Sequence, residues 1–342
     1  MLMTQEPMLR RFWHCLFPVS DLTEKPRPFR LLGEDIVVWK DLDGKPHAVQ
    51  DRCPHRTAKL SLGILNNGYI VCPYHGWAFD GEGTCKLIPQ ETAVRQRAIH
   101  VRAYHCAERY GQVWVCLDEP AFDIPHIEPY GMPGFRQVFE FSEDWACTPL
   151  RIMENEFDAA HLSFVHATSF GSTDPVPNLP SIELFDDGFI ARSRPAVRNP
   201  EGLRVSLHTT DDTTVRMITG RYYVPFFRVT EIAYPNGLKN ILVTALTPID
   251  DRSTRFNQFV LRNDTEAEVC TEQVIAFDRM VTLEDKAILE STDPDVPFDN
   301  SEGEEEHMAS DRPGLLMRKL VRSVCDDLRA KSTPKETELA GA

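Results

Sequence analysis

The stretch of sequence that decides the fold contains two short motifs, CPHR at residues 53–56 and GYIVCPYHGWAFDGEGTCKLIPQ at residues 68–90. CPH at residues 53–55 and CPYH at residues 72–75 each supply one thiol and one imidazole, and each lies at the end of a run of β-type residues. Two Cys and two His suit a structural zinc ion, although zinc sites more often pair their cysteines as Cys-x₂₋₄-Cys. The alternative is a [2Fe–2S] cluster with two cysteines on one iron and two histidines on the other. The motifs therefore predict a metal centre on Cys53, His55, Cys72 and His75.

The sequence around these motifs predicts a small antiparallel β domain. Short β-type runs alternate with turns: PFRLLGEDIVVWKD, HAVQDRC, GYIVCPYHGWAFD and RYGQVWVCLDE. Prolines at positions 120, 125, 129 and 133 then predict an irregular connector over residues 121–134. We therefore expect a first domain over residues 1–120 and a second domain over residues 121–342.

The second domain follows a different pattern, which predicts an α+β fold. Residues 151–166 have the periodicity of a helix, and two further helices are predicted over residues 265–291 and 309–330. The acidic segment at residues 293–307 is predicted to be a polar loop. An antiparallel sheet is predicted from five alternating runs: ELFDDGFIARSRP, LRVSLHTTD, TVRMITGRYYVPFF, NILVTALTPI and RFNQFVLRN.

Composition excludes several classes of function. The formal net charge is −15, with 37 basic and 52 acidic residues, which disfavours nucleic-acid binding. No apolar run is long enough to span a membrane, and the first residues do not resemble a signal peptide. Nine cysteines without a disulfide-type spacing indicate reduced thiols. We therefore expect a cytoplasmic protein without a membrane or nucleic-acid partner.

A second candidate metal site lies in the predicted helix over residues 151–166. Asp158 and His161 stand three residues apart and share one face of a helix. His161 and His166 are five residues apart, which places them about 140° from each other around a regular helix. Both histidines can bind one metal only if the helix is distorted or ends between them.

These motifs resemble those of the Rieske non-haem iron oxygenases. CPHR followed by CPYHGW is similar to the Rieske motif of that family, and the string N-x₂-D-x₂-H-x₄-H from Asn155 to His166 is similar to its mononuclear iron motif. Arg56-Thr57 and Tyr74 occupy positions where Rieske proteins of respiratory bc complexes carry extra cysteines, which favours the oxygenase branch. The resemblance implies a Rieske domain followed by a helix-grip catalytic domain whose antiparallel sheet is flanked by helices.

The resemblance also assigns roles to residues. It implies that His161 and His166 bind Fe(II) with a distant carboxylate, and the Glu-Asp-Lys context selects Asp285, with Glu284 as the nearest alternative. It makes Asp158 the bridge to His75 of a neighbouring subunit, with Asn155 beside it in the motif. That bridge implies a head-to-tail ring, a homotrimer.

The implied activity is that of a terminal oxygenase of the monooxygenase and demethylase branch. Such an enzyme uses O2 and NAD(P)H electrons, relayed by a ferredoxin or flavin reductase, to hydroxylate a small organic substrate or to remove its O- or N-methyl group. Three alternatives stay open: a ring-hydroxylating dioxygenase α subunit, a Rieske electron carrier with an inactive second site, and a structural zinc protein.

Two further groups of side chains have both a functional and a structural interpretation. Three basic residues beside the first motifs form either a docking spot for an acidic electron donor or ordinary solvated loop charges: Arg52, Arg56 and Lys59. Five aromatic residues either line a substrate cavity or, for most of them, belong to the core: Phe164, Phe170, Tyr222, Phe226 and Phe227.

Overall fold

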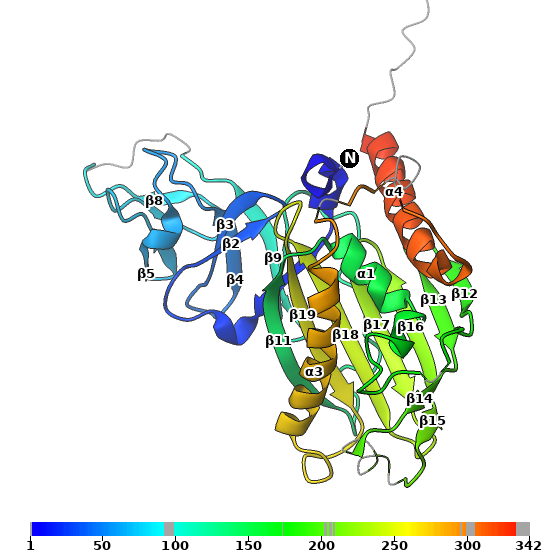
Figure 1. Cartoon of the computed structure of the whole chain (residues 1–342). Helices are drawn as coiled ribbons and strands as arrows, with labels where there is room; N and C mark the ends of the chain where they lie inside the picture. The colour runs from blue at the N-terminus through cyan, green and yellow to red at the C-terminus, as the bar shows by residue number, and fades with distance from the viewer. Residues whose placement is uncertain are drawn as a thin grey trace, which may run out of the picture.

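A small β domain is followed along the chain by a large sheet with helices on one face (Figure 1), which confirms the expected α+β fold. The structure is a computed structural model. It describes residues 2–91, 99–172, 174–201, 204, 207, 209–294, 296–298 and 305–332.

The N-terminal domain contains two antiparallel sheets with the strand orders β1-β10-β9-β4-β3-β2 and β5-β6-β7-β8. Asn67 and Gly68 join β5 to β6 with φ values of 51° and 79°, the type I′ geometry that suits a two-residue hairpin. The two sheets share a core that includes Trp39, Ile70 and Phe79. The strands are β1 (His14–Pro18), β2 (Arg27–Leu31), β3 (Glu34–Lys40), β4 (Pro46–Gln50), β5 (Ile64–Asn66), β6 (Tyr69–Val71), β7 (Ala78–Phe79), β8 (Cys85–Leu87), β9 (Ala103–Arg109) and β10 (Gln112–Cys116).

The C-terminal domain is built on a seven-stranded antiparallel sheet with the order β11-β19-β18-β17-β16-β13-β12. Two of these strands, β11 and β17, lie outside the predicted runs. A separate two-stranded ribbon pairs β14 with β15. The strands are β11 (Arg136–Trp145), β12 (Ser181–Phe185), β13 (Gly188–Ser193), β14 (Ala196–Arg198), β15 (Thr213–Val215), β16 (Met217–Tyr223), β17 (Phe227–Ala233), β18 (Lys239–Pro248) and β19 (Thr254–Arg262).

Three helices cover one face of this sheet. Figure 1 shows α1 (Pro149–Phe157) and α3 (Thr271–Leu289) lying across the sheet, and α4 (Arg312–Ser332) beside β12 and β13. The two later helices confirm the predictions over residues 265–291 and 309–330. The strand predicted for LRVSLHTTD is wrong where it is described, because Arg204 and Leu207 have helical backbone.

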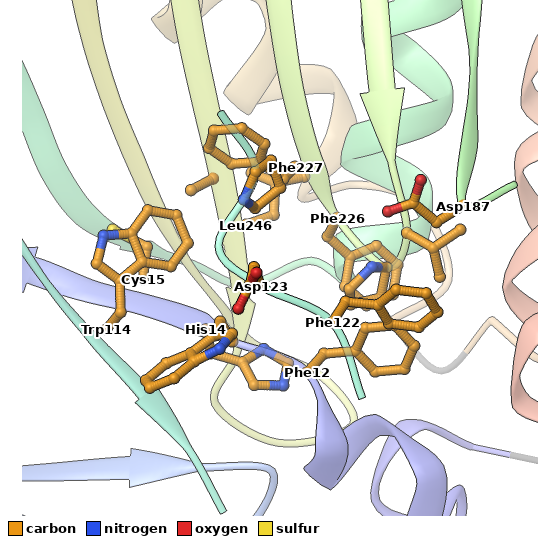
Figure 2. A pocket seen from close by; sticks show the side chains of 15 residues that line it. Phe12, His14, Cys15, Trp114, Phe122, Asp123, Asp187, Phe226, Phe227 and Leu246 are labelled. Carbon is orange, nitrogen blue, oxygen red and sulfur yellow. The ribbon is translucent and has the colours of Figure 1, made fainter. Parts of the chain in front are cut away.

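The opposite face of the sheet packs against the N-terminal domain and the connector. Phe227 and Val243 from the sheet share one core with Trp114 and Ile124. Figure 2 shows the small cavity beside this core, about 20 Å³ in volume and lined by aromatic residues from both domains. Residues 117–135, which connect the domains, contain no strand or helix, as the prolines predict.

No helix within the described ranges is long and apolar enough to cross a membrane.

Candidate active site

Two loops of the N-terminal domain hold the first candidate site, and they share one backbone pattern. The Cys53 carbonyl accepts from the Thr57 N–H at 2.9 Å, and the Cys72 carbonyl accepts from the Gly76 N–H at 3.0 Å. Thr57 and Gly76 both have positive φ, at 62° and 73°, which closes each loop tightly around its cysteine. The cysteine N–H groups in turn donate to carbonyls at the far ends of the loops, those of Ala58 and Trp77. The two motifs, which have similar sequences, therefore also form loops with the same backbone hydrogen bonds.

The four side chains on these loops point toward one another. Cys53 and Cys72 are buried free thiols that share a hydrogen bond, and burial raises the pKa of Cys53 to about 11. Nearer the surface, the rings of His55 and His75 lie 4.5 Å apart, and His55 stacks on Trp77 at 4.6 Å. Two inner sulfurs and two outer imidazoles match the donor set of a [2Fe–2S] cluster with unlike irons.

The spacing of these donors does not suit a single ion. Throughout the described ranges, one group of three or more His, Cys, Asp or Glu has ligand atoms within 4.8 Å of one another, and it lies in the other domain. The four N-terminal donors therefore do not form such a compact group, whereas the ligand atoms of one tetrahedral zinc lie that close together. The residues present fit a cluster of two irons better than they fit zinc.

In the C-terminal domain, helix α1 ends earlier than the sequence predicts. Thr148 caps its start by accepting the Leu150 N–H at 3.2 Å, and the helix ends at Phe157. Asp158 has extended backbone, and its carboxylate accepts the N–H groups of Ala160 at 2.7 Å and His161 at 3.2 Å. The prediction of one helix over residues 151–166 is therefore wrong beyond Phe157, because a side-chain cap starts a new short turn.

This break brings two histidines and one carboxylate together. Asp285 Oδ1 lies 3.1 Å from His166 Nε2 and 3.6 Å from His161 Nε2. Asp285 reaches them from α3, and the three residues form the group of possible metal ligands noted above. Asp285 Oδ1 is buried and has no hydrogen-bond partner among the described residues. A buried carboxylate oxygen without a partner, facing two imidazole nitrogens, is an arrangement that a divalent cation completes.

Neighbouring acids contact the outer nitrogens of the same two imidazoles. Glu284 Oε2 lies 2.7 Å from His166 Nδ1 and also accepts the Ser169 hydroxyl at 2.8 Å. Asp158 Oδ2 lies 3.4 Å from His161 Nδ1. Each imidazole thus has a carboxylate next to its Nδ1 atom, an arrangement that fixes the orientation of metal-binding histidines. Glu284 and Asp285, the two alternatives for the third ligand, lie against opposite nitrogens of His166.

The electrostatics of the site follow from these contacts. Burial opposes protonation of His166, but the adjacent carboxylates of Asp285 and Glu284 outweigh it and raise the pKa of that histidine. Burial likewise opposes ionisation of Asp158, yet the contact with His161 and the backbone N–H groups lower the pKa of that carboxyl.

A cavity of about 320 Å³ opens beside this group. Its apolar wall comes from residues of several elements: Phe170, Ile218, Ile232, Leu242 and Val281. Of the five aromatic residues with two interpretations, Phe170 lines the cavity and stacks on His166 at 4.8 Å. Phe164 is 73% exposed, and the other three lie in the core: Tyr222, Phe226 and Phe227.

A second hollow, of about 440 Å³, lies on the other side of the end of α1. Asn155, Phe157 and Asp158 line both hollows. The second hollow is lined by four acids, Glu154, Glu305, Glu306 and Asp311, and by Arg151, which pairs with Glu154 and Glu305.

The sequence analysis missed several residues of the site. Ser169, Glu156 and Arg228 all contact or line it, and none belongs to a motif. The sequence identifies Glu284 only as an alternative ligand. Because Glu284 is adjacent to Asp285 on α3, its contact with His166 could have been expected from the sequence.

Known families match both domains. The family model of the Rieske [2Fe-2S] domain matches residues 12–104, and that of the vanillate O-demethylase oxygenase C-terminal domain matches residues 145–327. Methylxanthine N1-demethylase NdmA of Pseudomonas putida is 31% identical over 92% of this chain and 89% of its own length. Methylxanthine N3-demethylase NdmB of the same organism is 30% identical over 86% and 84%.

Solved structures show the same architecture. Pseudomonas putida NdmA with caffeine has a TM-score of 0.80 and 28% sequence identity over 96% of this chain and 94% of that one. Dicamba monooxygenase bound to dicamba has a TM-score of 0.81 over 94% and 99%, and at 23% identity it supports the fold alone.

Proposed function

This chain belongs to the Rieske non-haem iron oxygenases, and we propose that it is a terminal oxygenase that oxidatively demethylates a small N- or O-methylated compound. Membership makes it an oxidoreductase that works with O2 and an electron-donating partner. The demethylase names of relatives that match most of the chain support the reaction type. The observation that carries the proposal is the buried oxygen of Asp285 facing two histidine nitrogens beside a cavity of about 320 Å³.

The proposed ligands are the side chains of the two candidate sites described above. Cys53, His55, Cys72 and His75 would hold the [2Fe–2S] cluster, and His161, His166 and Asp285 would hold the mononuclear Fe(II). When bound, the cluster supplies single electrons and the iron supplies O2 activation. We retain a boundary at residue 120 between the domains that carry them.

Other residues of the site orient the proposed iron ligands and keep water away from the substrate. Glu284 accepts the Nδ1 proton of His166 and so keeps Nε2 of that ring turned toward Asp285. Asp158 caps the turn that carries His161 and lies behind its outer nitrogen. The apolar cavity wall excludes water from the methyl group to be oxidised. The oxidised methyl group would then leave as formaldehyde.

We also propose that electrons cross between subunits of a homotrimer. Figure 1 shows the four-stranded sheet of the N-terminal domain, whose loops carry the cluster ligands, far from α1. Three exposed basic residues, Arg52, Arg56 and Lys59, lie beside those loops, whereas acids outnumber bases in the hollow beside Asp158. This complementarity supports docking of the cluster end of one chain onto the Asp158 end of the next.

NAD(P)H, through a partner ferredoxin or flavin reductase, is the proposed electron source, and the cytoplasm is the proposed compartment. Nine free cysteines support a reducing environment.

Electron paramagnetic resonance of the anaerobic, dithionite-reduced protein with nitric oxide tests the proposal. A low-field signal of a high-spin iron–nitrosyl beside the reduced Rieske signal is expected. Incubation with O2, a reductase and candidate methyl compounds should then release formaldehyde. A Rieske signal without the nitrosyl, in iron-replete protein, would instead identify an electron carrier, and a cis-diol product would identify a dioxygenase.

A further inference from the structure

Beneath helix α3, two carboxyl groups that we call the acid pair, Glu140 and Asp278, lie against each other inside the C-terminal domain. Asp278 on α3 is 8% exposed, and its side chain shares a hydrogen bond with that of Glu140 on β11. Each has one buried oxygen, Glu140 Oε1 and Asp278 Oδ2, that no donor group of the described residues reaches. Two ionised carboxylates are both acceptors and cannot form a hydrogen bond with each other. One proton held between them supplies the missing donor.

The surrounding charges are balanced when the acid pair holds that one proton. Four side chains approach the acid pair from the sheet: Gln258 and Arg262 on β19, Tyr234 after β17, and Arg216 before β16. The charge of Arg262 is already matched, because Arg262 and Arg136 form ion pairs with Asp264 and Glu266. Arg216 forms no ion pair among the described residues, and its Nε and Nη2 are buried without a hydrogen-bond partner there. A singly protonated acid pair carries one negative charge, which balances Arg216, whereas a fully ionised pair would leave an unmatched buried charge.

The environment of the acid pair favours its protonated form. Burial and the negative charge of Asp278 raise the pKa of Glu140 well above its usual range, and burial also raises the pKa of Asp278. The amide of Gln258, which donates to Glu140 Oε2 at 2.7 Å, opposes this effect without cancelling it. The acid pair therefore keeps a proton at a pH where exposed carboxyl groups are ionised.

The acid pair and Arg216 are connected to both segments that carry the proposed iron ligands. Asp278 and Asp285 are seven residues apart on α3, nearly two full turns, so they share the face of the helix that lies over the sheet (Figure 1). The guanidinium of Arg216 lies 5.3 Å from the centre of the Phe170 ring, which stacks on His166 at 4.8 Å. A contact that fastens α3 to β11 at Asp278 therefore also determines where Asp285 lies.

We propose that Glu140 and Asp278 share one proton at neutral pH, and that this shared proton positions Asp285 by fastening α3 to β11. The two acids are positioning residues, because they act on the metal site through the helix. Loss of the proton to solvent leaves two carboxylates that repel each other across the contact between helix and sheet. The role toward iron rests on the ligand set proposed above, whereas the shared proton does not depend on it.

Infrared spectroscopy of the purified protein at neutral pH tests the shared proton. The wild type should show the carbonyl band of a protonated carboxyl group, and Glu140→Gln should lose it, because its amide donates to Asp278 without a shared proton. Glu272→Gln changes an exposed acid of the same helix and is the matched control, which should keep the band. A wild type without the band, or an equal band in Glu140→Gln, would overturn the shared proton.

Urea unfolding counts the same proton. The folded acid pair holds a proton that the unfolded chain, with its ordinary carboxyl groups, releases. Between about pH 6 and pH 8, the unfolding equilibrium constant of the wild type should therefore rise about tenfold per pH unit relative to that of Glu140→Gln. The same pH dependence in the two proteins would contradict the proposal.

Anaerobic iron titration against a chelator tests the positioning role. Glu140→Gln should keep the wild-type affinity for Fe(II), because its amide N–H replaces the shared proton. Glu140→Leu, which has no polar group to offer Asp278, should weaken Fe(II) binding about tenfold or more and change the shape of the iron–nitrosyl signal. Its reduced Rieske signal should stay unchanged, which shows that the protein is folded.

The outcomes separate the two proposals. Weakened Fe(II) binding by Glu140→Gln, or wild-type binding by Glu140→Leu, would overturn the positioning role. A wild-type protein without the iron–nitrosyl signal would instead contradict the proposed oxygenase function, while the infrared and unfolding results still decide whether the acid pair holds a proton.

Discussion

At the scale of single residues, Glu284 and Asp285 show how two adjacent acids of one helix take different tasks. The sequence could not separate them, because both are acidic and both lie in the same Glu-Asp-Lys context. Geometry separates them: Asp285 faces the inner nitrogens of both histidines, and Glu284 contacts the outer nitrogen of His166.

Substitution of these two acids should therefore have unequal effects on iron. Asp285→Ala should lose the mononuclear iron and keep the cluster, because it removes the proposed ligand. Glu284→Ala should weaken iron binding about 10–100-fold, since it removes the acceptor that orients His166, and Glu284→Gln should recover part of that loss. Anaerobic iron titration with a chelator as competitor measures both. Iron retained by Asp285→Ala but lost from Glu284→Ala would reverse the two assignments.

His14, beside the cavity of Figure 2, makes stability depend on pH. Burial lowers its pKa to about 4, while its Nε2 lies 2.9 Å from the Leu9 carbonyl. The unfolded chain, with a histidine pKa near 6.5, therefore takes up the proton first as pH falls. Stability should be lost between about pH 6.5 and pH 4, amounting to about 2 kcal/mol at pH 5. Urea unfolding should show that His14→Gln loses less stability than the wild type between pH 7 and pH 5, and an equal loss would contradict this assignment.

At the scale of elements, the end of helix α1 differs most from the sequence-based prediction. Hydrophobic periodicity correctly predicts a helix over the first part of residues 151–166. It cannot predict that a side chain caps the next turn. Asp158 does so through two backbone N–H groups, and this brings His161 and His166 to one point. The sequence analysis requires a helix that is distorted or ends between the two histidines, whereas the regular helix ends at Phe157, before both of them.

The charge of Asp158 should matter more for turnover than for metal content. Asp158→Asn keeps an oxygen for the Ala160 N–H but removes the negative charge beside His161. We expect normal iron and cluster content and turnover reduced about 100-fold. Asp174→Asn, which changes an exposed carboxylate of the same cavity, is the control for turnover. Iron loss from Asp158→Asn would show that Asp158 supports the site structurally instead.

Helices α1 and α4 are joined by a buried ion pair. Arg318, only 3% exposed, donates through Nη2 to Glu154 at 2.7 Å, and a second bond runs from its Nε. Arg318→Met removes one of two arginines that pair with Glu154, since Arg151 Nη1 also donates to that carboxylate at 2.9 Å, and should destabilise the protein by about 1–3 kcal/mol. Lys319→Met, at an exposed position of α4, is the matched control. Thermal unfolding of both variants measures the effect, and equal melting temperatures would show that the pair contributes no net stability.

At the scale of the whole molecule, the proposed ring depends on complementary charge. Arg56→Glu, at the exposed cluster end, should weaken subunit association about tenfold or more. Added salt should weaken the wild-type assembly in the same direction, because it screens exposed charges. Sedimentation velocity over a range of protein concentrations measures both effects. Wild-type protein that stays monomeric at every concentration would contradict the ring.

The family and fold class followed from sequence because their signals are local. Cys53, His55, Cys72 and His75 lie in two compact motifs, and most strands show alternation. The strand β17 was missed because FRVTEIA places Arg228 and Glu231 among its apolar residues. The contact of Arg228 with Glu156 was equally out of reach, because it joins positions 72 residues apart that only the folded sheet brings together.

The alternation of β17 has a consequence for how the substrate range of this enzyme can change. Phe227 and Val229 hold the sheet to the N-terminal domain, whereas Arg228, Thr230 and Ile232 face the cavity. We expect mutations at the second set to alter substrate recognition without touching the joint between the domains. One strand thus separates positions that face the substrate cavity from positions that hold the domains together. A directed-evolution library confined to the cavity-facing positions of β17 exploits that separation.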